Sequence, residues 1–315
     1  AFIIPPSWMF LSTFEGLRKN IIENQSIESL LHLSRGVFGA DFGASSAVIK
    51  NTSNANACGT YFRLVERTFQ EFEQSHLRML FEQTLANHDF KYNFKEYTKD
   101  VTELPYSEDG NRIYYPNVEQ MNFEKIPGAP IGYWVTKNMF RSFGMDSVSS
   151  VSESRCGMNT GDNETMIRLW HEISFTNFYD RASSTEDFHK NGYKYTPYNK
   201  GGTARKWYGN LEYVLKYDRT HYEILLNQGN HLPSRQYYFK PAITWSDVTS
   251  SSLGATFRYE RLGTVFDGSA AVAFVNEENR DYLLGLLNTK YVKMLAKVFN
   301  PTLHFKLGDY NKIPY

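Results

Sequence analysis

The sequence is poor in cysteine and in long apolar runs. Only Cys58 and Cys156 occur among 315 residues, and they form no CxxC pair. This scarcity argues against a disulfide framework and favours a reducing, cytoplasmic compartment. No apolar run approaches the roughly 18–20 residues that a membrane span needs, so no membrane partner is expected. The apolar start is broken by Pro5-Pro6 and has no basic leader, and we do not expect it to act as a signal peptide.

Net charge is also missing, because 34 Lys and Arg balance 34 Asp and Glu. No global field draws the chain toward nucleic acid, so any site for an anionic partner must be a local patch. Hydrophobic residues make up 41% and aromatic residues 16%, which is typical of a globular protein with sizeable cores. The length suits one large or two ordinary domains. The first residue, Ala1, falls within a pattern, so we expect the chain to be a piece of a longer protein.

Several catalytic motifs are absent. The sequence has no P-loop, no GxSxG elbow and no Cys/His spacing for zinc, and His171-Glu172 is not followed by a second histidine. The nearest nuclease-like pair, Asp187 with Lys190, has poor spacing. Residues 36–43 contain three glycines, but they do not lead from a strand into a capped helix as a dinucleotide loop does.

Strands and helices alternate in the first part of the chain. We predict strands over 2–4, 29–33, 46–50 and 61–65, and a helix from a Ser12–Glu15 capping box to about Glu23. A strand, a helix and a strand within about 30 residues are typical of an α/β sheet.

The later elements are less regular. We predict helices over 66–86, 133–143, 163–172 and 279–298, strands over 212–216, 237–246, 257–259 and 264–266, and an irregular connection over 87–115. In the turn at 157–164, Gly161 can take a positive φ and Asp162 can cap the helix from Asn163. This turn has two open interpretations, a rigid structural turn or a turn that faces DNA.

The most distinctive stretch is 197–210, which holds three cations, three aromatic residues and three glycines in fourteen residues. From His189 to Arg219 seven Lys and Arg face two Asp and Glu, a local charge of about +5. Cations neutralise phosphates, aromatic rings stack on bases, and glycines allow close approach. The alternative is an exposed hairpin with solvated lysines.

The motifs resemble one family. Residues 198–202 (YNKGG) and 205–210 (RKWYGN) resemble the C-terminal half of the adenine-specific DNA methyltransferases of BREX (PglX-type) phage-exclusion systems. Further similar pieces follow the family's order, and they are residues 4–18, 126–134 (IPGAPIGYW), 160–163 (TGDN) with Arg168 and Trp170, 239–245, 286–290, 300–302 and 313–314.

The resemblance implies a fold and a function. It implies an α/β fold, the closing part of a Rossmann-like methyltransferase domain, over 1–65, a helical or irregular connection over 66–130, and an α+β, TaqI-like target-recognition region over 131–315. The whole enzyme would methylate N6 of adenine in DNA with S-adenosylmethionine, in phage defence or restriction-modification. This part would bind double-stranded DNA, set sequence specificity, and work with the upstream catalytic domain.

The implied DNA-binding residues belong to two motifs. They are Asn199, Lys200, Gly201, Gly202, Arg205, Lys206, Trp207 and Tyr208, together with Thr160 and Asn163. No catalytic, cofactor-binding or metal-binding residue is expected, because the cofactor loop and the catalytic Asn/Asp/Ser-Pro-Pro-aromatic tetrapeptide are missing. Ile4-Pro5-Pro6-Ser7-Trp8 lacks the polar first residue, and we interpret it as a strand-to-helix turn. Two alternatives remain open: the same region of a fused type II restriction-modification enzyme, or a protein-interaction module that does not bind DNA.

Overall fold

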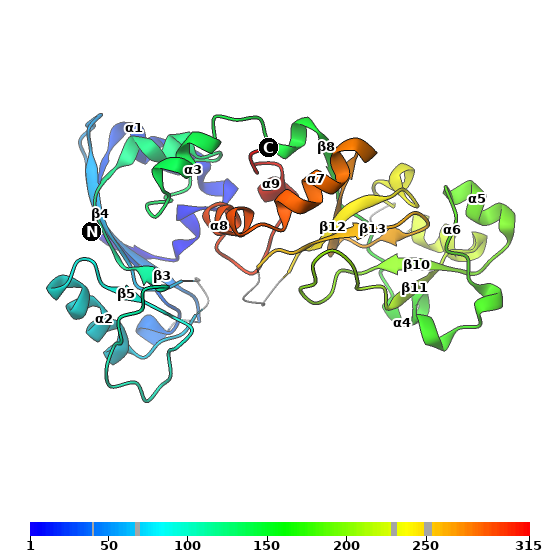
Figure 1. Cartoon of the computed structure of the whole chain (residues 1–315), viewed down its shortest axis with the longest axis horizontal. Helices are drawn as coiled ribbons and strands as arrows, with labels where there is room; N and C mark the ends of the chain where they lie inside the picture. The colour runs from blue at the N-terminus through cyan, green and yellow to red at the C-terminus, as the bar shows by residue number, and fades with distance from the viewer. Residues whose placement is uncertain (40, 67–69, 228–231, 249–253) are drawn as a thin grey trace. The chain divides into compact units, whose positions relative to one another are not determined.

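The computed structural model describes residues 1–39, 41–66, 70–227, 232–248 and 254–315. The chain forms two compact units (Figure 1). Unit 1 comprises Ala1–Met145 and Val298–Thr302, and unit 2 comprises Asp146–Lys297 and Leu303–Tyr315. The predicted fold class, α/β followed by α+β, is confirmed, since sheets and helices mix in both units.

Unit 1 is organised by a five-stranded sheet with the order β1-β3-β2-β4-β7. Its strands are β1 (Phe2–Ile4), β2 (Ser26–Leu33), β3 (Ala44–Lys50), β4 (Cys58–Arg63) and β7 (Tyr114–Glu119). β2 and β4 are parallel, and the other neighbours are antiparallel. β5 (Lys91–Tyr92) and β6 (Asn111–Arg112) form a separate pair. β7 shares the sheet of β1 to β4, so the segment predicted as a connection, residues 66–130, belongs to the same compact unit as residues 1–65. The functional boundaries predicted at residues 65 and 130 stay predictions.

The helices of unit 1 differ from the predicted ranges. They are α1 (Glu15–Asn24), α2 (Gln74–Ala86) and α3 (Lys137–Ser142). The predicted capping box is wrong, because Ser12–Phe14 forms a 3-10 turn and no side chain caps α1. α2 begins later than the predicted residue 66, and residues 67–69 lie outside the described ranges. α3 begins at Lys137 because Thr136 caps it by accepting a hydrogen bond from Met139 N at 3.4 Å.

A buried arginine joins two turns of unit 1. Arg18 is only 1% exposed and donates four hydrogen bonds, to the carbonyl oxygens of Trp8 (2.9 Å), Leu11 (2.7 Å), Gly128 (2.6 Å) and Ala129 (2.9 Å). Burial lowers the pKa of its guanidinium to about 10, so it stays charged at neutral pH. The 4–18 and 126–130 motifs therefore meet at one side chain. Trp8 lies in the same core, as expected for a strand-to-helix turn, and its Nε1 donates to Ser45 Oγ at 2.9 Å.

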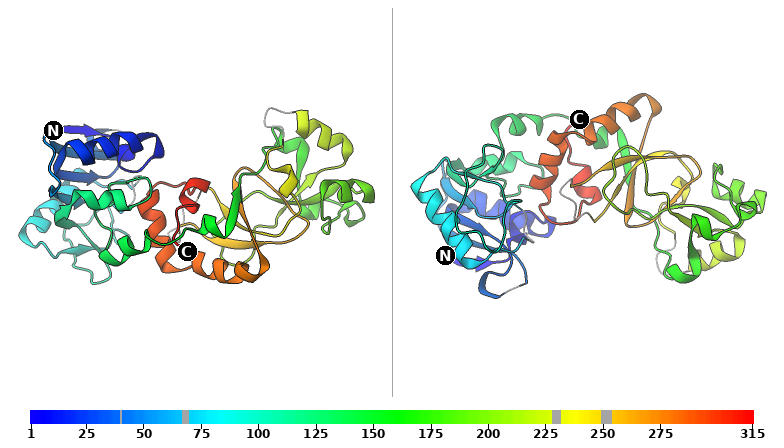
Figure 2. Two further views of the ribbon diagram at one scale, coloured as in Figure 1. Left: turned by 90° about the horizontal axis from the view of Figure 1, so that it is seen from above. Right: turned by 60° about the horizontal axis from the view of Figure 1, so that its bottom comes forward.

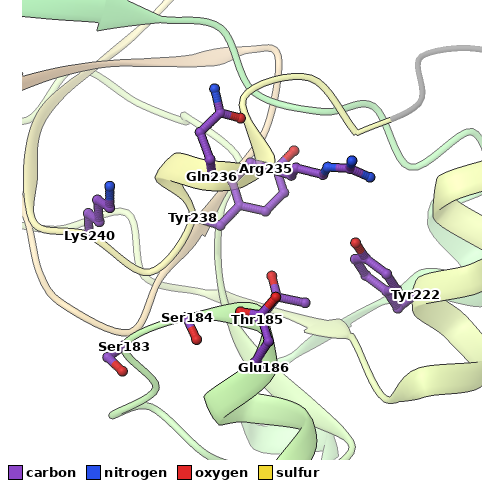
Figure 3. Close-up of a pocket in the computed structure, with 9 residues that line it drawn as sticks. All are labelled: Ser183, Ser184, Thr185, Glu186, Tyr222, Arg235, Gln236, Tyr238 and Lys240. Carbon is purple, nitrogen blue, oxygen red and sulfur yellow. The ribbon is translucent and has the colours of Figure 1, made fainter.

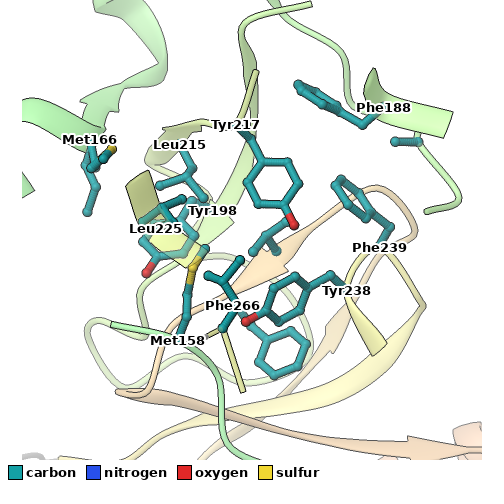
Figure 4. Close-up of a cluster of buried hydrophobic side chains, with 14 of the residues drawn as sticks. Met158, Met166, Phe188, Tyr198, Leu215, Tyr217, Leu225, Tyr238, Phe239 and Phe266 are labelled. Carbon is teal, nitrogen blue, oxygen red and sulfur yellow. The ribbon is translucent and has the colours of Figure 1, made fainter. Parts of the chain in front are cut away.

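Unit 2 contains two four-stranded sheets. One has the order β14-β10-β11-β9 and the other β13-β12-β15-β8. The strands of the first are β9 (Ile167–Leu169), β10 (Tyr195–Asn199), β11 (Tyr213–Lys216) and β14 (Val265–Phe266). Those of the second are β8 (Ser152–Arg155), β12 (Ala242–Ser246), β13 (Phe257–Glu260) and β15 (Ala270–Val275). Both sheets contribute to one aromatic-rich core, in which Tyr198, Tyr217 and Phe266 are buried (Figure 4).

The helices of unit 2 are short. They are α4 (Asn163–Met166), α5 (Thr185–Asn191), α6 (Arg219–Asn227), α7 (Glu277–Leu287), α8 (Lys290–Phe299, whose end counts with unit 1) and α9 (Leu307–Tyr310). α5 and α6 lie next to each other in both views of Figure 2, and His189 and Tyr222 make a ring contact between them. The Asp162 cap and the positive φ of Gly161 are confirmed.

Two helix predictions in unit 2 are wrong. Residues 167–169 form the edge strand β9, because they pair with β11, a partner distant in sequence. The predicted helix over 279–298 is broken into α7 and α8. Asn288 ends α7 because its side-chain amide bonds both the N–H (3.1 Å) and the carbonyl (2.9 Å) of Phe257 on β13.

Candidate nucleic-acid interface

The loop predicted to bind DNA leaves β10 through a glycine turn. Gly201 has φ +75° and Gly202 has φ +111°, which glycine adopts without steric cost. A Cβ on Gly201 would lie 2.8 Å from the carbonyl oxygen of Ser269. Ser269 Oγ also lies 3.0 Å from the carbonyl oxygen of Lys200. The 267–269 turn therefore fixes the start of the loop and requires glycine there.

Asn199 holds this turn through a side-chain hydrogen bond to its backbone. Its side chain is buried, donates to Thr244 Oγ1 at 2.9 Å and to the Glu260 carboxylate, and accepts from Gly201 N at 3.0 Å. All the contacts of Asn199 are thus internal to the protein. The Asn199 side chain therefore ties the start of the loop to β12 and β13.

Lys200 brings the two predicted motifs together. Its Nζ donates to Asn163 Oδ1 at 3.2 Å and forms an ion pair with Asp267 Oδ2 at 3.1 Å. Thr160, which is buried, donates to the same Asn163 oxygen at 2.5 Å. Thr160, Asn163 and Lys200 therefore form one cluster, although 37 residues separate Asn163 from Lys200.

Asp267 is a central residue that the sequence did not reveal. Besides Lys200, it accepts hydrogen bonds from Tyr198 Oη (2.5 Å) and from Ser269 N and Oγ (2.8 and 2.6 Å). Burial by itself would raise the pKa of Asp267, but the hydrogen bonds from Ser269 and Tyr198 and the charge of Lys200 outweigh it, so the pKa lies below its ordinary value. A single Asp-Gly-Ser turn gives no signal in sequence that marks it as the partner of a lysine 67 residues away.

The tip of the loop is exposed while its backbone is paired. Trp207 has φ +73°; its N–H donates to the carbonyl of Phe257, and its own carbonyl accepts from Tyr259 N, both at 3.0 Å. This pairing adds the loop to β13 and leaves the Trp207 and Tyr208 side chains 53% and 63% exposed.

The two cations of the tip differ. Arg205 is exposed, and among the residues that the structure describes it has no hydrogen-bond or ion-pair partner. Lys206 is also exposed, but its Nζ donates to the carbonyl of Asn288 at the end of α7, at 2.7 Å. Arg205 can therefore meet an anion with its full set of donors, whereas Lys206 would share or exchange a bond.

A buried charged pair lies behind the loop. Arg258 and Glu260 are two residues apart on β13 and are 1% and 2% exposed. Burial raises the pKa of Glu260 to about 7, against the opposing hydrogen bond from Asn199 and the charge of Arg258. The sequence predicted a strand at 257–259, but the alternating pattern cannot show that its charged residues face inward.

A separate cavity of about 530 Å³ opens near the start of α5 (Figure 3). It is lined by Ser183, Ser184, Thr185, Glu186, Tyr222, Arg235, Gln236, Tyr238 and Lys240. Several of its hydroxyl groups are already engaged within the protein. Ser183 Oγ donates to Asp187 at 3.1 Å, and Thr185 Oγ1 bonds Tyr217 Oη at 3.0 Å. None of the residues predicted to bind DNA lines this cavity.

Within the described ranges, no group of three or more His, Cys, Asp or Glu side chains is arranged to hold a metal ion. In the same residues, no helix has both the length and the apolar character needed to cross a bilayer.

The comparison with solved structures concerns the fold. Over 98% of its length, the chain is similar in structure to 38% of the Type IIL restriction-modification enzyme MmeI, solved in complex with DNA, with a TM-score of 0.50 and 9% identity. At this identity the likeness concerns the fold alone. No family model matches the chain.

Sequence relatives are more specific. The chain is 30% identical over its whole length to the adenine-specific methyltransferase PglX of Lacticaseibacillus casei (strain Zhang) and 31% identical over 98% of its length to the adenine-specific methyltransferase BrxX of Escherichia coli O9:H4 (strain HS). The resemblance to the PglX-type adenine-specific methyltransferases is confirmed. The chain spans about a quarter of the length of these relatives, 25% and 23% respectively.

Proposed function

We propose that the chain is the C-terminal target-recognition part of a site-specific DNA N6-adenine methyltransferase, and that it binds duplex DNA and sets sequence specificity. The observation that carries the proposal is that Arg205 is exposed and has no hydrogen-bond or ion-pair partner among the described residues, on a glycine-held loop within a segment of about +5 charge. The similarity to PglX and BrxX along the whole chain supports it.

Each residue of the loop has a role in this proposal. Arg205, Lys206 and Lys200 contact phosphates, which position the protein on the duplex. Trp207 and Tyr208 support the loop or stack against the nucleic acid. Gly201 and Gly202 let the backbone come close. Asn199, Thr160 and Asn163 hold the cations in place through their hydrogen bonds.

The chemistry belongs to the whole enzyme. S-adenosylmethionine would supply the methyl group when bound, and the upstream catalytic domain would receive an adenine flipped out of the duplex. We assign no residue of this chain to that step, and we expect the chain alone not to bind S-adenosylmethionine. Titration calorimetry with the isolated chain tests this expectation.

Two other functions have some support. A fused restriction-modification enzyme would use the same region, and the fold similarity to MmeI favours it as the second candidate. A protein-interaction module would instead use the exposed aromatic side chains, such as Trp170 and Phe175, as anchors. Only the last alternative predicts no binding to DNA.

The test is a salt titration of DNA binding. Each phosphate contact made by a cation steepens the dependence of log K on log salt by roughly 0.9 on duplex DNA. Arg205→Ala with Lys206→Ala should therefore flatten the slope by about 2. The matched control, Arg181→Ala with Lys290→Ala, removes the same charge from other surface positions and should leave the slope near that of the wild type.

A comparison of a duplex that holds the recognised site with a scrambled duplex separates contacts to phosphates from contacts to base edges. If Arg205 reads a guanine edge, Arg205→Ala should cost about 1–3 kcal/mol on that duplex and little on a scrambled one. A folded double variant with the slope of the wild type on both duplexes would exclude the loop from the interface. A wild-type chain that binds no duplex at low salt would refute the proposed function itself.

A further inference from the structure

A second group of cations lies on the sheet that carries the loop. Arg168 on β9 pairs with Val214 on β11, and Lys216 pairs with Tyr195 on β10. Paired residues project to the same side of a sheet, and residues two apart on a strand share that side. Arg168 and Lys216 therefore share one face of the sheet, opposite to the face on which Ile167 and Leu215 enter the core. Lys194 directly precedes β10, and its Nζ lies 5.9 Å from the ring centroid of Tyr195, the residue that pairs with Lys216.

These cations repel one another. Burial lowers the pKa of Lys216, and the charges of Arg168 and Lys194 lower it further. Two carboxylates act in the opposite direction, but both are engaged elsewhere. Asp162 accepts the capping hydrogen bond from Thr165 N at 3.0 Å, and Asp218 bonds His221 Nδ1 at 2.7 Å.

The donors of this group are largely unused. In the part of the chain that the structure describes, Lys194 and Lys216 form no ion pair. Arg168 donates from Nη1 to the carbonyls of Glu164 and Ile167, and its Nε and Nη2 have no partner among the described residues. A fold that keeps like charges close is stabilised when an anion binds beside them.

The group adjoins the candidate interface. Asn163, the first residue of α4, accepts a hydrogen bond at 3.2 Å from Lys200, which directly follows β10. Asp162 directly precedes α4; hydrogen bonds from Thr165 lower its pKa, and the charge of Lys216 lowers it further. The start of α4 therefore lies close to both Lys200 and Lys216.

We propose that Arg168, Lys194 and Lys216 form a second phosphate-binding surface, which holds the backbone of the same DNA duplex without reading its bases. This inference rests on the proposed function, because it requires that the chain bind DNA. The positive charge around 194–216 would then contact the duplex at two places on the protein, the loop and the sheet face.

The experiment uses the whole chain and the variant Lys194→Ala with Lys216→Ala. The slope of log K against log salt on a duplex should flatten by about 2. The loss of affinity should be equal on a duplex with the recognised site and on a scrambled duplex, because phosphates carry no sequence information. The control Lys95→Ala with Lys290→Ala, an equal loss of charge from exposed positions on other elements, should keep the slope of the wild type.

The outcomes separate this surface from the loop. If the wild type binds and the Lys194/Lys216 variant keeps the slope of its control, the second surface is wrong and the proposed function stands. If this variant flattens the slope while the Arg205/Lys206 variant does not, the sheet face is confirmed and the loop tip is excluded. If the wild type binds no duplex, both proposals fail together.

Discussion

Each unit contains a cation that joins two motifs distant in sequence, and the two cations do so differently. In unit 1, Arg18 joins the 4–18 and 126–130 turns, is 1% exposed, and points its donors at four backbone carbonyls. In unit 2, Lys200 joins the 160–163 turn to the glycine loop, and its side chain keeps 27% of its surface exposed. Arg18 is buried and uses four of its five N–H donors on backbone carbonyls, whereas Lys200 is partly exposed and starts the loop that carries the exposed Arg205 and Lys206. Burial thus distinguishes a cation whose donors are used within the protein from one that stays partly accessible.

The largest effect that this comparison predicts is on stability in unit 1. Arg18→Ala removes four charge-assisted hydrogen bonds and leaves buried carbonyls without donors, and we expect the free energy of unfolding to fall by about 4 kcal/mol. Arg18→Lys should recover only part of this, because an ammonium lacks the planar fork of a guanidinium. Urea unfolding measures both variants.

Arg205→Ala is the contrast in unit 2. It should change the free energy of unfolding by less than about 0.5 kcal/mol, because Arg205 is exposed and supports no other group. Equal stabilities of the Arg18 and Arg205 variants would break the distinction between the two cations.

The next effect concerns the buried pair behind the loop. Glu260 has an ordinary pKa of 4.5 and a pKa of about 7 in the folded chain. The native state therefore binds more protons than the unfolded state between these values, so this group stabilises the fold below pH 4.5 and its contribution is lost as the pH rises toward 7. The loss is about 3 kcal/mol at most.

Glu260→Gln should remove this dependence while its amide oxygen can still accept from Asn199. The measurement is the difference in unfolding free energy between wild type and variant from pH 4.5 to 8. The unfolding free energy of the wild type should fall relative to that of the variant as the pH rises. A difference that stays constant over this range would show that Glu260 ionises normally in the folded chain.

A further, smaller effect than that of Glu260 tests the glycine turn. Gly201→Ala forces a side chain into φ +75° and places its Cβ 2.8 Å from the carbonyl of Ser269. We expect a loss of about 2 kcal/mol in unfolding free energy. Gly192→Ala is the matched control: φ is +70° there, and no atom lies within 4 Å of the added Cβ, so it should cost about 1 kcal/mol. Thermal unfolding of both variants checks the order, and the reverse order would contradict the close contact with Ser269.

Much of the local structure was predictable because it depends on neighbouring residues. The strands at 2–4, 46–50, 212–216 and 264–266 follow from alternation and runs of β-formers. The Asp162 cap follows from one side chain and the helix start next to it. The glycine turn at 201–202 was predictable in the same way, since positive φ is a property of single residues.

The remaining features depend on partners that are distant in sequence. Residues 167–169 become a strand because β11 lies beside them, and the 279–298 helix breaks because Asn288 bonds β13. Composition and motifs by themselves indicated the resemblance to the PglX-type methyltransferases, the mixed fold class and the positive segment around 197–210. Only the tertiary structure decided that Asn199 is buried, that Lys200 pairs with Asp267, and that Arg205 has no partner among the residues that the structure describes. The reason is that burial and pairing are set by chain segments that approach each other only after folding.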